Sequence, residues 1–257
     1  MPRSALPVLS LRLFAVWQRH FLVWRKLAIP SILGNLADPL IMLFGLGYGL
    51  GAMMGGGADY FAFLAGGFLA STTMYAATFE ALYSAFSRMH VQKTWEAIVN
   101  APMALDDVLA GEWVWAATKA LAAGVCMLLV VSLFGYASFP LALATLPVLV
   151  LIGLAFASLG LMVNALATGY DFFAYYMTLF LTPMMMLSGV FFPVTQLPAP
   201  VQALAQVLPL HHGVSLVRPL MAGEWPSQAL LHLGVLAAYA ALGFCAAVLM
   251  TRRRLLK

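Results

Sequence analysis

The sequence predicts an all-α polytopic membrane protein, and three observations decide this fold class. Hydrophobic residues make up 63% of the 257 residues and charged residues only 9%, against roughly 25% charged residues in an ordinary soluble domain. The mean hydropathy is +0.95. The apolar residues form continuous runs, not the alternating segments of an outer-membrane barrel. We therefore exclude a soluble globular enzyme, a disordered chain and a nucleic-acid-binding domain, and expect no nucleic-acid partner.

Six apolar runs are long enough to cross a bilayer, which takes about 20 mostly apolar residues. The expected spans are residues 31–52, 60–87, 113–136, 141–168, 172–192 and 228–250. Several runs exceed the required length, so we expect tilted helices or interfacial ends.

Residues 1–30 precede the first span, and their pattern indicates an amphipathic helix that lies in the headgroup plane. Arg12, Arg19 and Lys26 recur every seven residues and share one face, whereas Trp17 and Trp24 lie on the opposite face. The alternative is the beginning of one long first span. Five basic residues before Pro30 favour the interfacial helix.

The distribution of Lys and Arg predicts the orientation in the membrane. Basic residues gather in the N-terminal arm, in the segment after the second span and in the tail with Arg252, Arg253 and Arg254. The segments on the other side are nearly free of them. The positive-inside rule then places both termini in the cytoplasm, which requires an even number of spans.

Two connections are too long to be simple turns. Residues 88–112 are polar, and Pro102 splits them into a helical piece at about 92–99 and a second piece that starts with Asp106 and Asp107, where negative charge suits the helix dipole. Residues 193–226 hold six of the fourteen prolines yet remain apolar. They predict an external helical hairpin that re-enters the outer leaflet; the alternative is an external loop packed on the protein surface.

A run of alternating glycines, Gly45 to Gly51, ends the first span. It formally matches a dinucleotide fingerprint, but no strand precedes it, so the match is rejected. The small-xxx-small spacing indicates close helix packing instead. The sequence holds no Walker A lysine motif, so we expect no cofactor in this chain and a separate subunit for any ATP.

Two acidic residues, Asp38 and Glu80, lie inside apolar runs, where a charge costs a few kcal/mol. Each has two interpretations. Both could contact a substrate or gating pathway. Alternatively, Asp38 with Pro39 marks a helix restart, and Glu80 sits near the cytoplasmic interface because Arg88 follows eight residues later.

Neither a metal site nor a catalytic site is expected. His211 and His212 are adjacent, so they cannot share a helix face, and no HxxxH or HExxH spacing occurs. Cys126 and Cys245 form no CxxC pair. Met184, Met185 and Met186 indicate core packing, with a malleable substrate-facing wall as the alternative.

Three separated motifs together resemble the ABC-2 export permeases. The first runs from Thr78 to Tyr83 and continues through Arg88 to Ala101-Pro102. The second is Leu187–Pro193, followed by Gln196-Leu197-Pro198. The third is Leu208–His212 with Val217–Leu220. Asn35–Pro39 before the glycine run narrows the resemblance to the NodJ branch, the permeases of nodulation-factor exporters.

The resemblance implies a complex of two permease copies, which form the membrane pathway, and two separate NodI-like ATPase subunits, which would bind ATP and Mg. It also implies a cytoplasmic coupling helix at about residues 93–102, and contact of the N-terminal helix with the ATPase. The residues expected to touch the ATPase are Lys93, Thr94, Trp95, Glu96, Ala97, Ile98, Asn100 and Pro102. Trp95 and Ile98 are three apart, so we expect them to form one apolar contact.

The pathway is expected between the first and fifth spans of two copies in a bacterial inner membrane. Its residues would be Asp38, Gly45, Gly47, Gly49, Glu80, Phe180, Met184, Met185, Phe191, Phe192 and His211. The branch implies export of an amphiphilic lipid-linked saccharide by a transport subunit that is not an enzyme. The alternatives are an ABC-2 exporter of a polysaccharide, drug or lipid, an ion-coupled secondary transporter, and a lipid-modifying enzyme.

Overall fold

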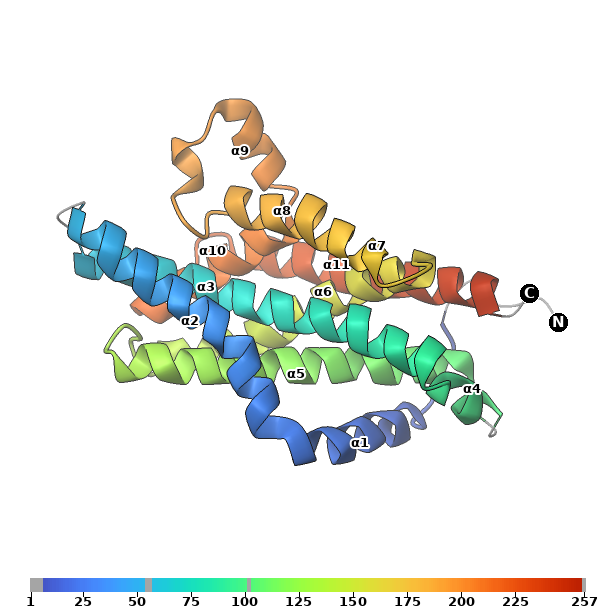
Figure 1. The fold of residues 1–257 in the computed structure, drawn as a ribbon. Coiled ribbons are helices and arrows are strands. Elements are labelled where there is room, and N and C mark those ends of the chain that lie inside the picture. Colours follow the sequence, from blue (N-terminus) through green and yellow to red (C-terminus); the bar gives the residue numbers. More distant parts are fainter. Residues whose placement is uncertain (1–6, 54–56, 101–102, 256–257) are drawn as a thin grey trace.

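The computed structural model describes residues 7–53, 57–100 and 103–255, and every regular element in these ranges is helical (Figure 1). Four helices make the core of an elongated bundle: α3 (Gly57–Phe79), α5 (Leu105–Leu133), α6 (Thr145–Leu166) and α11 (Ala229–Leu255). Helix α3 is the most enclosed, since nearly every side chain from Leu64 to Thr78 is buried. The all-α fold class predicted from the sequence is confirmed.

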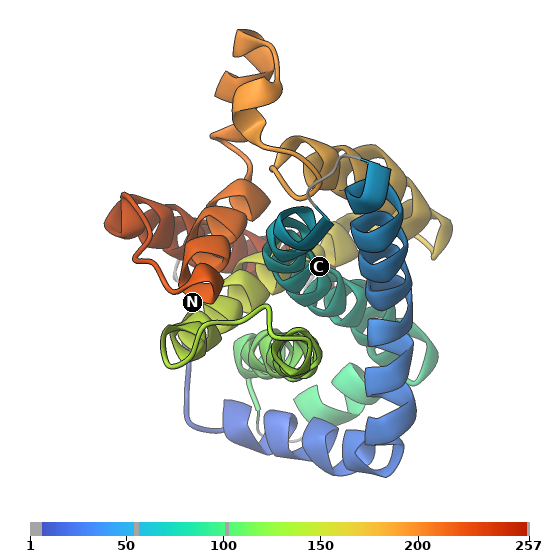
Figure 2. The same ribbon diagram turned by 90° about the vertical axis from the view of Figure 1, so that its left-hand side faces the viewer.

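The N-terminal helix α1 (Leu13–Trp24) crosses beneath α5 and bends through a 3-10 segment, η1 (Arg25–Leu27), into α2 (Ala28–Met53) (Figures 1 and 2). Because of this bend, α1 and α2 run in different directions (Figure 1). Val16 of α1 is buried against Gly111 of α5, where a Cβ would lie 2.5 Å from the Val16 Cβ. A glycine on α5 is therefore what lets α1 approach the bundle so closely.

Beyond Phe79 the α3 stretch continues through two π segments, η2 (Glu80–Ser84) and η3 (Ser87–Val91), into the short helix α4 (Thr94–Val99). Lys93 turns the chain before α4 with a positive φ of 50°. The beginning of α1, α4 and the last turns of α11 lie together at one end of the bundle, the α4 end (Figure 1). The opposite end, the far end, holds the end of α2 and the connection between α5 and α6.

Five helical stretches are long and apolar enough to cross a membrane: Leu13–Met53, Gly57–Val91, Leu105–Leu133, Leu141–Leu166 and Ala229–Leu255. The predicted span 172–192 folds as α7 (Asp171–Tyr176), the π segment η5 (Met177–Leu181) and α8 (Thr182–Leu187). This stretch is shorter than the others, so the sixth span stays a prediction.

Two local expectations differ from the structure. The expected helix start at Asp106 and Asp107 is present, since α5 begins at Leu105, but the helix continues without a break to Leu133, so no separate helical piece precedes the third span. Asp106, Asp107 and Glu112 are buried in this helix because they find polar partners. Helix α2 passes through Pro39 without a restart, because membrane-type helices tolerate the loss of one backbone donor. Asp38 is therefore an exposed residue within a helix and not a cap.

The proline-rich segment 193–226 folds into η6 (Val194–Gln196), α9 (Ala199–Ala205) and α10 (Pro209–Ala222). Helix α9 projects from the bundle, whereas α10 packs against α3, α6 and α11 (Figure 1). The second helix contains His211 and His212 instead of following them, and the re-entrant hairpin stays a prediction, as does the depth of the two helices in a membrane.

Candidate functional site: a buried charge network

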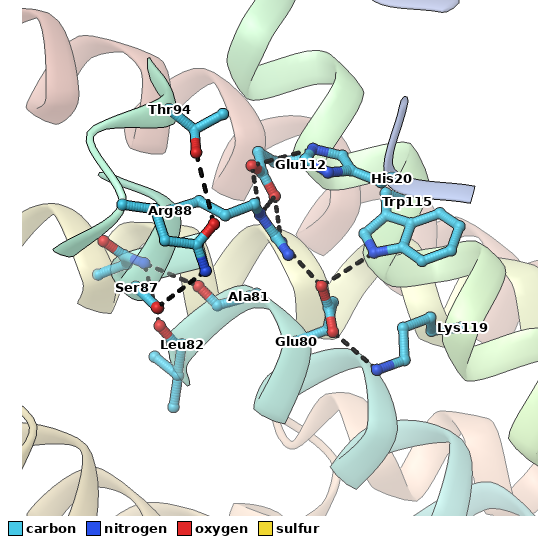
Figure 3. Close-up of polar contacts among 12 residues, drawn as sticks. His20, Glu80, Ala81, Leu82, Ser87, Arg88, Thr94, Glu112, Trp115 and Lys119 are labelled. Carbon is cyan, nitrogen blue, oxygen red and sulfur yellow. Dashed lines mark hydrogen bonds and ion pairs between the residues drawn. The ribbon is translucent and has the colours of Figure 1, made fainter. Parts of the chain in front are cut away.

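Two buried carboxylates face one arginine at the α4 end (Figure 3). Arg88 Nη2 lies 2.7 Å from Glu80 Oε1 and 2.5 Å from Glu112 Oε2, and Arg88 Nε donates to Glu112 Oε1 at 2.8 Å. Glu80 is 3% exposed and Glu112 is 2% exposed. We call Glu80, Arg88, Glu112 and their partners below the charge network.

Four further side chains complete the charge network. Lys119 Nζ donates to Glu80 Oε2 at 2.8 Å, and Trp115 Nε1 donates to Glu80 Oε1 at 2.9 Å. Trp95 Nε1 donates to Glu112 Oε1 at 2.9 Å, and His20 Nε2 lies 3.2 Å from the same oxygen. The network thus joins α1, the α3 stretch, α4 and α5 through side-chain contacts.

The charge network balances its own charges. Glu80 and Glu112 carry two negative charges, and Arg88 and Lys119 carry two positive charges. A buried charge is tolerated only when it is paired and hydrogen-bonded. Removal of one charge therefore leaves an excess charge of the opposite sign in the network, which costs about 3–5 kcal/mol.

The π segments place Glu80 and Arg88. Glu80 opens η2, and Arg88 lies in η3. Asn164 of α6 donates its side-chain amide to the carbonyls of Ala81 at 2.9 Å and Leu82 at 3.2 Å, so a neighbouring helix supports the irregular turn. Single π turns in α-helices are frequent at functional sites.

Helix α4 presents two different faces. Thr94 and Trp95 are buried, and the Trp95 indole points to Glu112. Trp95 and Ile98 therefore do not form one outward apolar contact, because the Trp95 donor is used inside the chain. The side of α4 that faces outward includes Lys93, Glu96, Ala97 and Asn100, and Pro102 lies outside the described residues.

A groove of about 480 Å³ separates α4 from α1. Ala97, Ile98 and Gln92 line one wall, and Ala15, Val16 and Arg19 line the other. The groove is open to the outside. On its inner side, α4 contacts the charge network through Trp95. A protein that filled it would touch α1 and α4 together.

The first turn of α5 also forms hydrogen bonds and an ion pair with residues near both ends of the described chain. Asp107 accepts hydrogen bonds from the Ser10 backbone N at 2.7 Å and its hydroxyl at 2.8 Å. Asp106 accepts from the Val8 backbone N at 2.8 Å and pairs with Arg252 of α11. These aspartates act through side-chain contacts to distant segments, in addition to their expected place in the first helical turn.

Glu80 belongs to the charge network. The other expected pathway residues lie on α2, in and after the stretch from α7 to α8, and on α10. On α2, Asp38 is exposed, and a Cβ on Gly45 or Gly49 would meet nothing within 4 Å. Gly47 instead faces inward, where a Cβ would lie 2.5 Å from the Phe61 ring. In and after the stretch from α7 to α8, Phe180 is exposed, and four others are half-buried: Met184, Met185, Phe191 and Phe192. His211, also half-buried, lies on α10.

Sequence reasoning missed Glu112, Lys119 and His20 as members of the charge network. A signal for Lys119 existed, because a single lysine within an apolar run needs an acidic partner, and Glu80 was the acidic residue left without one. No local pattern pairs Glu112 with Arg88, since they lie 24 residues apart on different helices.

A second polar junction lies toward the far end. Arg218 of α10 donates from Nε to the Phe63 carbonyl at 3.1 Å and from Nη2 to the Gly189 carbonyl at 2.6 Å. Its guanidinium also lies 3.6 Å from the centre of the Phe63 ring. No acidic residue of the described chain pairs with it. We call this contact between α3, α10 and the turn after α8 the Arg218 junction.

Comparisons with known proteins agree with the fold and with the motifs. The sequence model of the ABC-2 type transporter family matches residues 12–222. The chain is 49% identical to nodulation protein J of Rhizobium leguminosarum bv. viciae over 99% of both proteins. It is 48% identical to nodulation protein J of Rhizobium meliloti, over 98% of this chain and 97% of that protein. The nodulation protein J of Azorhizobium caulinodans is 36% identical over 79% of this chain. The chain is therefore a multi-pass membrane protein that belongs to the ABC-2 type transporter family, within the group of nodulation J proteins.

Proposed function

We propose that this protein is the membrane subunit of an ATP-driven exporter that moves an amphiphilic, lipid-linked saccharide resembling a lipo-chitooligosaccharide out across the bacterial inner membrane. The observation that carries the proposal is the identity of nearly half of all residues, over almost the full length, with nodulation J proteins. Two copies would form the pathway, and two NodI-like ATPase subunits would bind ATP and Mg beneath them.

The α4 end is the side on which the ATPase would bind, and we place it in the cytoplasm. Lys93 and Arg253 are exposed there, and Arg19 is exposed on α1; basic residues favour the cytoplasmic side. The groove between α1 and α4 offers an apolar floor at Ile98 and Met103 with Arg19 at its rim. A partner segment in this groove would press on α4, and the charge network would pass that force to the α3 stretch.

The exposed face of α2 is where the second copy would pack. Asp38, Met42, Gly45 and Gly49 recur at helical spacing and point away from the chain. Glycines separated by three residues let two helix backbones approach closely. The substrate would pass along this seam, next to the exposed aromatic and methionine side chains of the stretch from α7 to α8.

The experiment that tests the groove uses the permease co-expressed with the NodI-like ATPase. Ile98→Asp places a charge on the apolar floor and should abolish co-purification of the ATPase, whereas Ile98→Val should leave it intact. Equal co-purification with both variants would remove the groove as the ATPase contact.

The substrate is tested in inverted membrane vesicles that hold both subunits. A radiolabelled lipo-chitooligosaccharide should accumulate inside the vesicles only with hydrolysable ATP. The matched control is the same saccharide without its acyl chain, which should not accumulate. Accumulation of neither compound, with the ATPase bound and active, would refute this substrate class while leaving the subunit assignment in place.

A further inference from the structure

A pocket of about 270 Å³, with both charged and apolar side chains in its lining, lies where α1 bends into α2, next to the α3 stretch and α5. Trp24 of α1, Ser31 of α2, Ser84 of η2 and Lys119 of α5 line it. Glu80 and Arg88 of the charge network form part of its inner wall. We call it the corner pocket.

The corner pocket is rich in donors that the chain does not use. Trp24 Nε1 is buried and has no hydrogen-bond partner among the described residues. Arg19, at the rim, has no ion-pair partner among them. The carboxylate in the lining, Glu80, is already engaged by Arg88, Trp115 and Lys119. An acceptor-rich ligand would satisfy the unused donors.

The charge of the lining selects an anion. Arg19, Arg88 and Lys119 face one carboxylate, Glu80. Counting Glu112 behind Arg88 as a second carboxylate still leaves one excess positive charge. A single phosphate diester carries the matching negative charge, and it offers oxygens to the indole N–H and to a guanidinium. A zwitterionic headgroup would bring a cation into the same positive surroundings.

The surface beside the corner pocket is apolar. Val23 is 59% exposed, Leu27 is 63% exposed and Leu33 is 62% exposed. Val23 and Leu27 belong to the lining of the corner pocket, and Leu33 continues the apolar surface from the bend onto α2. A ligand with a phosphate and acyl chains matches this order of surfaces, whereas free phosphate would leave the apolar part unused.

We propose that the corner pocket binds the phosphate headgroup of an anionic glycerophospholipid, with the acyl chains of the lipid lying along α2. Pockets of this kind, basic and between helices at the cytoplasmic side, bind anionic headgroups in other membrane proteins. The choice of the cytoplasmic leaflet rests on the proposed orientation of the exporter, but the pocket and its ligand class do not. Because the lipid phosphate would lie beside Lys119 and Arg88, it would touch the same network that holds Trp95 of α4.

The test is native mass spectrometry of the purified permease alone, with phosphatidylglycerol or phosphatidylcholine of identical acyl chains. Phosphatidylglycerol should be retained preferentially. Arg19→Gln, which removes an exposed charge, and Trp24→Phe, which keeps an aromatic ring but removes the donor, should each weaken its retention about fivefold. That change corresponds to about 1 kcal/mol per contact. Arg19→Lys should retain most of the binding.

The control is Arg253→Gln, which removes an exposed cation from the last turn of α11, outside the lining of the corner pocket, and should leave retention unchanged. Equal retention of the two lipids, or equal losses in Arg253→Gln and Arg19→Gln, would overturn the site. Complete displacement by millimolar inorganic phosphate would assign it to free phosphate. Displacement by a chito-oligosaccharide would assign it to the exported saccharide. Either displacement would overturn the lipid. None of these measurements depends on export, so the lipid site and the proposed function can be refuted independently of each other.

Discussion

The charge network and the Arg218 junction each join three or more elements, but they stabilise a half-buried arginine in different ways. Arg88 faces two carboxylates that are themselves buried, whereas Arg218 faces two backbone carbonyls and an aromatic ring. Paired charges depend on each other, so the network responds as a unit. Backbone carbonyls carry no net charge, so a substitution of Arg218 would leave no unpaired charge behind. The stability of the Arg218 junction therefore depends only on local contacts.

The largest effect is expected from Glu112→Gln, which removes a charge without changing the shape of the side chain. Arg88 would keep one carboxylate for its charge, and the Trp95 contact would weaken. We expect a loss of about 3–5 kcal/mol in the free energy of unfolding, the cost of breaking a buried ion pair. Denaturant titration in mixed micelles measures it, with Glu96→Gln on the exposed face of α4 as the control.

Replacement of both Arg88 and Glu112 gives a second test of the same ion pair. Arg88→Met combined with Glu112→Leu removes both charges, so it should be less harmful than the sum of the two single changes. Additive losses would show that the two side chains do not stabilise the fold as a pair.

Arg218→Met should have an intermediate effect. The Phe63 and Gly189 carbonyls would lose their donor but no charge would be stranded, so we expect about 1–3 kcal/mol in the free energy of unfolding. Arg253→Met serves as the control for loss of an exposed arginine. A loss as large as that of Glu112→Gln would contradict the distinction between the two sites.

The smallest effect is expected at an uncharged contact of the far end. Gly47→Ala would place its Cβ 2.5 Å from the Phe61 ring, which itself stacks on Tyr136, so crowding should cost about 1 kcal/mol. Gly45→Ala meets nothing within 4 Å and should be neutral or slightly stabilising, because alanine favours a helix over glycine. Thermal unfolding of the two variants in one detergent gives the comparison, and equal melting temperatures would refute it.

The sequence predicted the membrane helices because long apolar runs leave few other structures in a bilayer. It placed a helix start correctly at Asp106 and Asp107, but it separated that helical piece from the third span because the charges of Asp106, Asp107 and Glu112 interrupt the apolar pattern until their partners are known. Those partners, at Ser10, Arg252 and Arg88, come from segments that only the fold brings together. The same reason hid the inward direction of Trp95, since helical spacing alone allows it to face either side.

The two π segments below α3 have a consequence for motion. A π turn holds one residue more than an α turn. If that surplus residue moves along the stretch, the segment between its old and new positions rotates by roughly 100°, which is the angle per residue of an α-helix. Glu80 and Arg88 both sit in such turns. A shift of the surplus residue would therefore rotate the end of the α3 stretch that leads to α4 about its own axis, while the apolar part of α3 kept its place. A twist of this kind would transmit a signal as rotation, with no need for a rigid lever to swing through the bilayer.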